Sequence, residues 1–365
     1  MDLPVADVPL LSVRDLRTWF PTPAGTVKAV DGVSFEIDRG EVLGVVGESG
    51  SGKSVMAMSL IGLAPEPGRI ESGAVLWKGT DLVGAPQRDV RAIRGQEISV
   101  VFQDPMSSLN PVHTVGRQIA EAVRLHANVS RKEARERAID AMATVGIPLA
   151  RQRAGSYPHE FSGGMRQRVM IAMALVNEPD LLIADEPTTA LDVTIQAQVV
   201  SVLDEIRERT GTAILLITHD LGLVAGVADR LLVMYAGRVV ERGSTGQVFR
   251  RSRHPYTRAL LASLPRVDRA AGDRLRPIAG HPPSLLAVPA GCSFHPRCPY
   301  ARTPDPCATQ EPVLDRTSGG GESVAAQSAA CHFADEVATG TAPVTAGTVE
   351  VAAASGGAHA GGTQP

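Results

Sequence analysis

The chain has 365 residues, enough for one large domain with a smaller one, or for two domains of ordinary size. Lys and Arg number 36 against 39 Asp and Glu, and the resulting charge of −3 gives no overall attraction to nucleic acid or anionic lipid. The first residues, MDLPVADVPLLSV, show no basic segment followed by a long apolar run, and the apolar runs AILLIT and LLVMYA are too short to span a membrane. We expect a cytosolic protein, unless a partner holds it elsewhere.

The order of predicted elements indicates an α/β fold. Strand-like stretches over residues 10–37 lead to a continuous apolar strand at 42–46, and a helix begins near Gly52. Residues 114–178 are largely helical in pattern. Beyond them, the runs LLIAD, AILLITHD and RLLVMYAGRVVERG read as strands, with a helix at about 194–209. Strands that alternate with helices predict a largely parallel sheet.

A phosphate-binding motif occupies residues 47–54. GESGSGKS matches GxxxxGK(S/T), and it lies between a predicted strand and a predicted helix, as that motif requires. The glycines let backbone N–H groups face a triphosphate, while Lys53 neutralises the β/γ oxygens and Ser54 holds Mg²⁺. The nucleotide-binding residues expected here are Gly47, Ser49, Gly50, Ser51, Gly52, Lys53 and Ser54.

A second motif, LLIADEP at 181–187, ends a buried strand with two carboxylates. Ligands of parallel sheets gather at such carboxyl ends. We expect Asp185 to hold Mg²⁺ through water and Glu186 to polarise an attacking water. The pairing with a phosphate loop favours these roles over a purely structural acidic cap.

A third motif, FSGGMRQR at 161–168, places Ser162, Gly163 and Gly164 at the start of a helix, where an anion can be received. With it the chain resembles the nucleotide-binding subunits of ABC transporters, whose signature sequence reads LSGGQ or a close variant. Here the variant is Phe161, Ser162, Gly163, Gly164 and Met165, followed by Arg166 and Gln167.

The resemblance covers about residues 8–250. It implies a P-loop cassette with a mostly parallel sheet, an antiparallel β subdomain and a helical subdomain at about 114–178. It also implies that Gln103 contacts Mg²⁺ and assists catalysis, that Asp192, at the end of the loop after the acidic motif, is a nucleotide-binding residue, and that His219 is the switch histidine. Phe20 is the expected adenine-stacking aromatic, with neighbouring Trp19 as the alternative.

The mechanism of that family involves two chains. Two cassettes dimerise head to tail, and each ATP lies between one chain's phosphate loop and the other chain's signature helix. The resemblance therefore implies that Ser162 and its glycines serve the partner's ATP. Lys53, Ser54, Asp185, Glu186 and His219 would serve the ATP bound to this chain.

Two further stretches narrow the resemblance. QDPMSSLNPVHTVGRQI at 103–119 and HPYTRALLASLP at 254–265 are similar to segments of the oligopeptide, dipeptide and nickel importer ATPases. This implies a peripheral protein on the cytoplasmic face of the cell membrane. Its partners would be a second ABC ATPase subunit (a paralogue or another copy), two permease subunits and an external substrate-binding protein. We favour a peptide cargo, with nickel as the alternative.

A soluble ABC protein of DNA repair or translation is a less favoured alternative. Those proteins usually carry two nucleotide domains or a long coiled-coil insertion, and neither is present here. We expect no nucleic-acid partner.

The cysteines lie together near the C-terminal end, at Cys292, Cys298, Cys307 and Cys331. Clustered cysteines in a reducing compartment are more often metal ligands than disulfides. Four thiolates suit zinc or an iron–sulfur cluster, and the wide spacing without CxxC pairs favours the larger centre. The subfamily resemblance suggests a 4Fe-4S cluster, with zinc or reduced free thiols as alternatives and His295 and His332 as alternative ligands.

The cysteine site is expected to be structural or regulatory. No flavin or nicotinamide fingerprint accompanies it, so a redox enzyme is disfavoured. We expect three regions: a nucleotide-binding domain at 1–253, a small metal-binding C-terminal extension at 254–335, and a disordered tail at 336–365. The tail is rich in small residues that cannot bury enough surface to fold.

Overall fold

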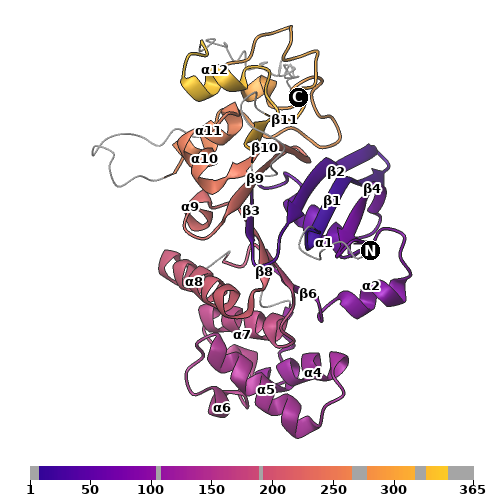
Figure 1. Cartoon of the computed structure of the whole chain (residues 1–365), viewed down its shortest axis with the longest axis vertical. Coiled ribbons are helices and arrows are strands. Elements are labelled where there is room, and N and C mark those ends of the chain that lie inside the picture. The colour runs from indigo at the N-terminus through magenta and orange to yellow at the C-terminus, as the bar shows by residue number, and fades with distance from the viewer. Residues whose placement is uncertain (1–7, 104–107, 189–191, 265–277, 317–325, 344–365) are drawn as a thin grey trace, which may run out of the picture.

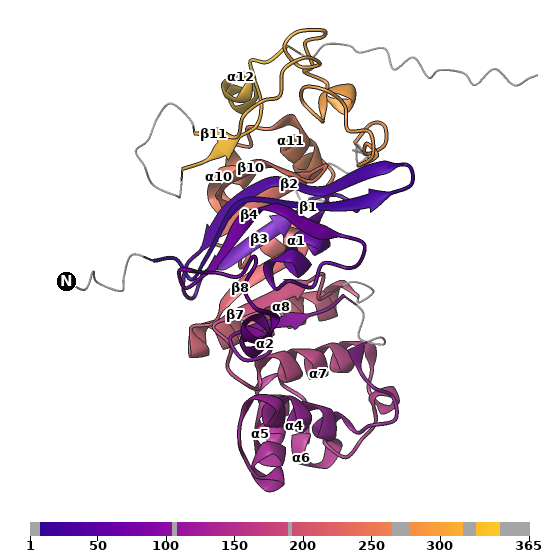
Figure 2. The ribbon, with the colours of Figure 1, turned by 90° about the vertical axis from the view of Figure 1, so that its right-hand side faces the viewer.

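The computed structural model describes residues 8–103, 108–188, 192–264, 278–316 and 326–343. Helices from the middle of the sequence form one end of the long axis, two sheets occupy the centre, and the C-terminal extension forms the other end (Figures 1 and 2). No described helix combines the length and apolar character needed to cross a membrane.

The first sheet is antiparallel, and its strands run in the order β2-β1-β4-β5. Its members are β1 (Leu11–Thr22), β2 (Gly25–Ile37), β4 (Arg69–Trp77) and β5 (Thr80–Asp81). Helix α1 (Lys53–Leu60) is joined to this sheet by a hydrogen bond of 2.8 Å between the hydroxyls of Thr18 and Ser59. This sheet is the antiparallel β subdomain that the resemblance implied.

The second sheet has the strand order β11-β12-β10-β9-β3-β8-β7-β6. Its members are β3 (Val42–Val46), β6 (Ile98–Val101), β7 (Leu181–Asp185), β8 (Ala213–Thr218), β9 (Arg230–Tyr235), β10 (Arg238–Ser244), β11 (Asp315–Arg316) and β12 (Ser328–Ala329). The pairs from β9 through β3, β8 and β7 to β6 are parallel, and those from β9 to β11 are antiparallel. Strand β3, which leads into the phosphate loop, lies between β8 and β9.

The central strands are buried on both faces, which explains their continuous apolar sequences. Val42 and Val46 of β3 belong to one core cluster, whereas Leu43 and Val45 belong to the other. Successive side chains of a strand point to opposite faces, so a single strand supplies both layers.

Helices α4, α5, α6 and α7 form the helical subdomain between β6 and β7. Besides α1, the helices of the described chain are α2 (Gln87–Ile93), α4 (Val115–His126), α5 (Arg131–Thr144), α6 (Ala150–Arg153), α7 (Gly163–Leu175), α8 (Val193–Thr210), α9 (Leu221–Val224), α10 (Thr245–Arg250), α11 (Pro255–Ala262) and α12 (Ala334–Thr339), with 3₁₀ turns η2 (Pro158–Glu160) and η3 (His295–Arg297). Ser130 begins α5 by accepting a hydrogen bond from the Glu133 backbone N–H.

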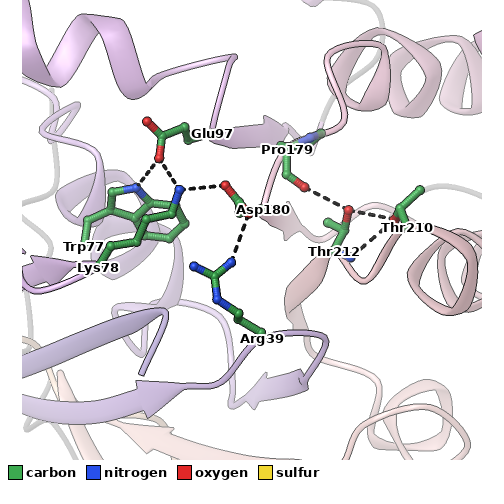
Figure 3. Close-up of polar contacts among 8 residues, drawn as sticks. All are labelled: Arg39, Trp77, Lys78, Glu97, Pro179, Asp180, Thr210 and Thr212. Atoms are coloured by element: carbon green, nitrogen blue, oxygen red, sulfur yellow. Dashed lines mark hydrogen bonds and ion pairs between the residues drawn. The ribbon is translucent and has the colours of Figure 1, made fainter. Parts of the chain in front are cut away.

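A polar network joins the two sheets at the amino ends of the parallel strands (Figure 3). Trp77 Nε1 donates to Glu97 over 2.9 Å, and Lys78 Nζ contacts both Glu97 and Asp180. Arg39 donates to Asp180 over 3.2 Å. Glu97 and Asp180 directly precede β6 and β7, so the network lies at the edge opposite the acidic motif at the end of β7.

The C-terminal extension is built onto the central sheet. Strand β12 pairs with β10, and Tyr256, Leu261 and Phe294 are members of one of the two main core clusters. The extension and the cassette therefore share one core, which local sequence patterns do not show because the paired segments lie far apart in the sequence. Ordered structure also continues past residue 335, since α12 reaches Thr339 and Val337 is fully buried. Residues 344–365 of the predicted tail lie outside the described residues.

Candidate nucleotide-binding site

The phosphate loop is shaped by close approach of its backbone to two neighbouring strands. A Cβ atom on Gly52, whose φ is +100°, would lie 2.1 Å from the Ala29 carbonyl oxygen of β2. One on Gly47 would lie 2.3 Å from the Met234 carbonyl oxygen of β9. Both obstacles are backbone atoms, so these positions require glycine.

The other loop residues divide between a buried base and an exposed rim. Ser51 is buried, and its carbonyl oxygen accepts a hydrogen bond of 3.0 Å from the Gly237 N–H. Ser49, Gly50 and Ser54 are exposed. The rim of the loop and the start of α1 therefore face solvent, as a phosphate site requires.

Lys53 and Ser54 connect the loop to itself and to β7. Lys53 Nζ donates to the carbonyl oxygens of Gly47 and Glu48 at 2.8 and 3.1 Å. Ser54 Oγ donates to Asp185 Oδ1 over 3.0 Å. The predicted magnesium ligands Ser54 and Asp185 are thus in direct contact, although they lie 131 residues apart in the sequence.

Glu186 is the centre of a second polar group. Gln103 Nε2 donates to Glu186 Oε2 over 3.1 Å, and His219 Nδ1 lies 3.4 Å from the same oxygen. The three residues come from the ends of β6, β7 and β8, which are adjacent parallel strands. Glu186 has a φ of +48°, a costly conformation for a non-glycine residue, and its N–H donates to Ile217 over 2.9 Å.

Burial shifts the pKa values of the two charged groups nearest the loop toward their neutral forms. Burial raises the pKa of Asp185, although the Ser54 hydrogen bond opposes that shift. Burial lowers the pKa of Lys53, against the opposing charges of Glu186 and Asp185. A divalent cation at Asp185 and a phosphate at Lys53 would each favour the charged form.

The signature residues begin α7, away from the loop of their own chain. The Ser162 side chain accepts from the Met165 N–H at 3.4 Å and so caps the helix. A Cβ on Gly164 would lie 2.6 Å from Ile195 of α8. Both views separate α7 from α1 along the long axis of the molecule (Figures 1 and 2).

The remaining predicted site residues have different surroundings. Asp192 caps α8 by accepting from the Ile195 N–H at 3.0 Å. Phe20 packs against Gly68, in the segment after α1, whereas the Trp19 ring lies 4.8 Å below Lys28 Nζ. Adenine stacking by Phe20 stays a prediction.

The sequence did not indicate that Glu48 of the phosphate loop is bound by the C-terminal extension. Arg297 Nη1 and Nη2 donate to its two carboxylate oxygens at 2.6 and 3.0 Å. The Glu48 N–H donates to Tyr256 Oη over 2.7 Å. These partners lie 249 and 208 residues away, so no local pattern could have indicated them.

The four cysteines form no disulfide and line one cavity of about 20 Å³ in the C-terminal extension. Burial raises the pKa of Cys298 and of Cys331 to about 12, so binding of a metal there would displace protons. Within the described ranges, no group of three or more His, Cys, Asp or Glu side chains has the arrangement of a metal-ion site. The predicted metal-binding character of the extension is therefore not supported by this geometry.

The fold and the phosphate loop define a P-loop nucleotide-binding protein of the ATP-binding cassette class. Residues 30–189 match the family model described as ABC transporter, and residues 240–307 match the one described as oligopeptide/dipeptide transporter, C-terminal region. The solved ATP-binding cassette MJ0796, a dimer bound to ADP and Pi, aligns with a TM-score of 0.59 and 25% identity over 64% of this chain and 98% of that one.

Curated relatives are closer. The Escherichia coli oligopeptide transport ATP-binding protein OppD is 50% identical over 85% of this chain and 91% of its own length. The Bacillus subtilis dipeptide transport ATP-binding protein DppD is 52% identical over 80% of this chain and 87% of its own length. The Mycobacterium bovis OppD is 53% identical over 84% of this chain, which spans only 50% of that relative. The chain belongs to the ABC transporter ATP-binding proteins, in the branch of the oligopeptide and dipeptide transporters.

Proposed function

We propose that the chain is the ATP-hydrolysing subunit of an ABC importer of dipeptides or oligopeptides. One observation carries the enzymatic part. The residues Gln103, Glu186 and His219 converge beside the Ser54–Asp185 contact, at the carboxyl end of the sheet and next to the phosphate loop. This arrangement has a place for a triphosphate, for its cation and for an attacking water.

The roles follow from the contacts. Backbone N–H groups of the loop and Lys53 bind the phosphates. Glu186 polarises the attacking water, and Gln103 and His219, which both contact its carboxylate, orient that carboxylate. Ser54, Asp185 and Gln103 offer the oxygen ligands that Mg²⁺ prefers, and bound Mg²⁺ would neutralise charge developing on the phosphates.

The position of the signature helix supports a head-to-tail dimer. Ser162, Gly163 and Gly164 lie at an exposed helix start that is separated from the phosphate loop of the same chain. We propose that they bind the nucleotide of a partner ATPase, either a second copy or a paralogue. Two permease subunits and an external substrate-binding protein would complete a transporter, with this chain peripheral at the cytoplasmic face of the membrane.

The peptide cargo is supported by the match of residues 240–307 and by the names of the relatives. The test is reconstitution of the chain with its permeases and binding protein in lipid vesicles. We expect ATP hydrolysis stimulated by peptide and uptake of labelled peptide. Stimulation by Ni²⁺ alone would replace the peptide cargo with nickel, and absence of hydrolysis under all conditions would overturn the enzymatic part.

We also propose that the four cysteines hold a 4Fe-4S cluster. Four thiolates around one cavity supply the number of ligands that a 4Fe-4S cluster takes. Their wide spacing in the sequence, without CxxC pairs, favours the cluster over zinc. The cluster would act as a structural cross-link between the segments of the extension that carry the cysteines.

The test is anaerobic purification followed by metal and sulfide analysis. We expect a brown protein with four iron atoms and four sulfides per chain, and loss of both in Cys331→Ser. A colourless protein with stoichiometric zinc, or with four titratable thiols and no metal, would rule out the cluster.

We further propose 1–253 as the nucleotide-binding domain and the residues from 254 as the extension.

A further inference from the structure

Glu48 is held from two directions by the C-terminal extension. Its carboxylate accepts hydrogen bonds from both terminal nitrogens of Arg297, a bidentate geometry that fixes the orientation of the carboxylate and also pairs its charge. Its backbone N–H donates to the Tyr256 hydroxyl. Its carbonyl oxygen accepts from Lys53 Nζ, the phosphate-binding ammonium. A displacement of Glu48 therefore moves the group that holds Lys53.

Arg297 is itself rigidly placed. Its side chain is only 5% exposed, against 26% for Glu48. Nε donates to the Ala279 carbonyl oxygen over 2.9 Å, and Nη1 also lies 3.3 Å from Tyr235 Oη. Because the guanidinium is planar, these contacts leave it few orientations other than the one that faces Glu48.

Three buried rings pack together where segment 292–298, which carries Phe294, meets Tyr235 and Tyr256. The ring centroids of Tyr235 and Tyr256 are 4.6 Å apart, and Phe294 lies 5.3 and 5.4 Å from them. All three are among the largest fully buried side chains. Close-packed interiors transmit displacement, so a shift of this segment reaches the loop through the rings as well as through Arg297.

We propose that Arg297 and Tyr256 are positioning residues of the phosphate loop, and that segment 292–298 sets the loop's affinity for ATP through them. The inference rests on the proposed ATPase function. It adds that nucleotide binding depends on the C-terminal extension, whose Cys292 and Cys298 flank the segment. Because Arg297 directly precedes Cys298 in the chain, a displacement of Cys298 would move Arg297 and weaken its hold on Glu48.

The first experiment measures the dissociation constant of ATP and hydrogen exchange of the backbone amides of residues 47–53 in the full-length protein. Arg297→Met keeps the apolar stem but removes the fork. We expect about a tenfold weaker ATP affinity and faster exchange in the loop, with kcat changed less than KM. Arg297→Lys should keep only part of the wild-type ATP affinity and exchange protection, because an ammonium cannot bind the carboxylate bidentately.

A gentler variant guards against misfolding. Tyr256→Phe keeps the three packed rings and removes only the oxygen that accepts the Glu48 N–H, so we expect a smaller loss of affinity at unchanged thermal stability. The matched control is Arg151→Met, which breaks an exposed ion pair with Glu136 in the helical subdomain and should change none of these readouts.

Coupling is tested by combining changes. The double variant Arg297→Met/Glu48→Gln should bind ATP no more weakly than Arg297→Met alone, because each of the two changes removes the same Arg297–Glu48 interaction. Cys298→Ser should weaken ATP binding in the wild-type background but not in Arg297→Met. Additive effects, or unchanged affinity and exchange in Arg297→Met and Tyr256→Phe, would overturn the inference. A wild-type protein that does not bind ATP would instead overturn the proposed function.

Discussion

The Glu186 side chain is 14% exposed and shares one carboxylate oxygen with Gln103 and His219, whereas the His219 side chain is 59% exposed. At the scale of single residues, the proposed mechanism makes Glu186 the group on which hydrolysis depends. A glutamine there keeps the shape and accepts the same contacts, but it cannot take a proton from water.

For Glu186→Gln we expect unchanged ATP affinity and a kcat that falls by at least about 100-fold, the usual minimum contribution of general base catalysis. Steady-state phosphate release and equilibrium ATP binding measure the two quantities. Glu133→Gln, in an exposed ion pair on α5, is the matched control and should leave both unchanged. Near-normal hydrolysis in Glu186→Gln would remove Glu186 from the mechanism.

At the scale of elements, the phosphate loop has a residue with positive φ, Gly52, whose backbone also lies against the backbone of β2. In Gly52→Ala the new methyl group would meet the Ala29 carbonyl oxygen, a backbone atom of β2 between the paired residues Lys28 and Val30. We expect loss of ATP binding and a lower thermal midpoint. Gly84→Ala is the matched control, because its φ of +80° is equally strained but nothing lies within 4 Å of the new atom. It should cost about 1 kcal/mol and keep ATP binding.

The signature helix is the second element to test. Ser162→Ala removes the cap of α7 but leaves the phosphate loop intact. We expect one chain to bind ATP normally, while ATP-driven dimerisation and turnover fall at least tenfold because the partner's nucleotide loses a ligand. Size-exclusion chromatography with ATP measures the dimer. Weakened binding of ATP to the monomer would show instead that Ser162 serves its own chain.

How much could be predicted follows from the separation of the partners. Lys53, Ser54, Asp185 and Glu186 could be proposed as site residues because each motif is contiguous and has a fixed structural context. Gln103 and His219 were proposed only through the family resemblance, and their contact with Glu186 is known from the structure alone. The pairing of β12 with β10 and the Glu48–Arg297 contact join segments far apart, without periodicity or turn residues to indicate them.

At the scale of the whole molecule, Glu241 of β10 joins the cassette to its extension. It is fully buried, and it accepts from the Arg253 and His254 N–H groups and from Gln327 Nε2 at 2.8, 2.9 and 2.8 Å. The sequence HPYTRALLASLP therefore begins α11 at a place fixed by a single carboxylate.

Glu241→Ala would leave these buried donors without an acceptor, and we expect a loss of about 3 kcal/mol or more in the free energy of unfolding. Urea denaturation measures the loss, and limited proteolysis should show cleavage near α11. Glu71→Ala, in an exposed pair with Arg69, is the control and should stay within about 0.5 kcal/mol. Equal stability of the two variants would contradict this role for Glu241.

The position of β3 between β8 and β9 also determines how long β3 lacks its sheet partners during synthesis on the ribosome. The strand that leads into the phosphate loop ends at Val46, but its two neighbours are complete only at Thr218 and Tyr235. At about 5–20 residues per second, the nascent chain carries this apolar strand without its sheet partners for about 10–40 s. Both edges of β3 lack a partner until β8 is made, and one edge still lacks a partner until β9 is made, so the newly made chain carries a risk of wrong strand pairing that the finished protein does not.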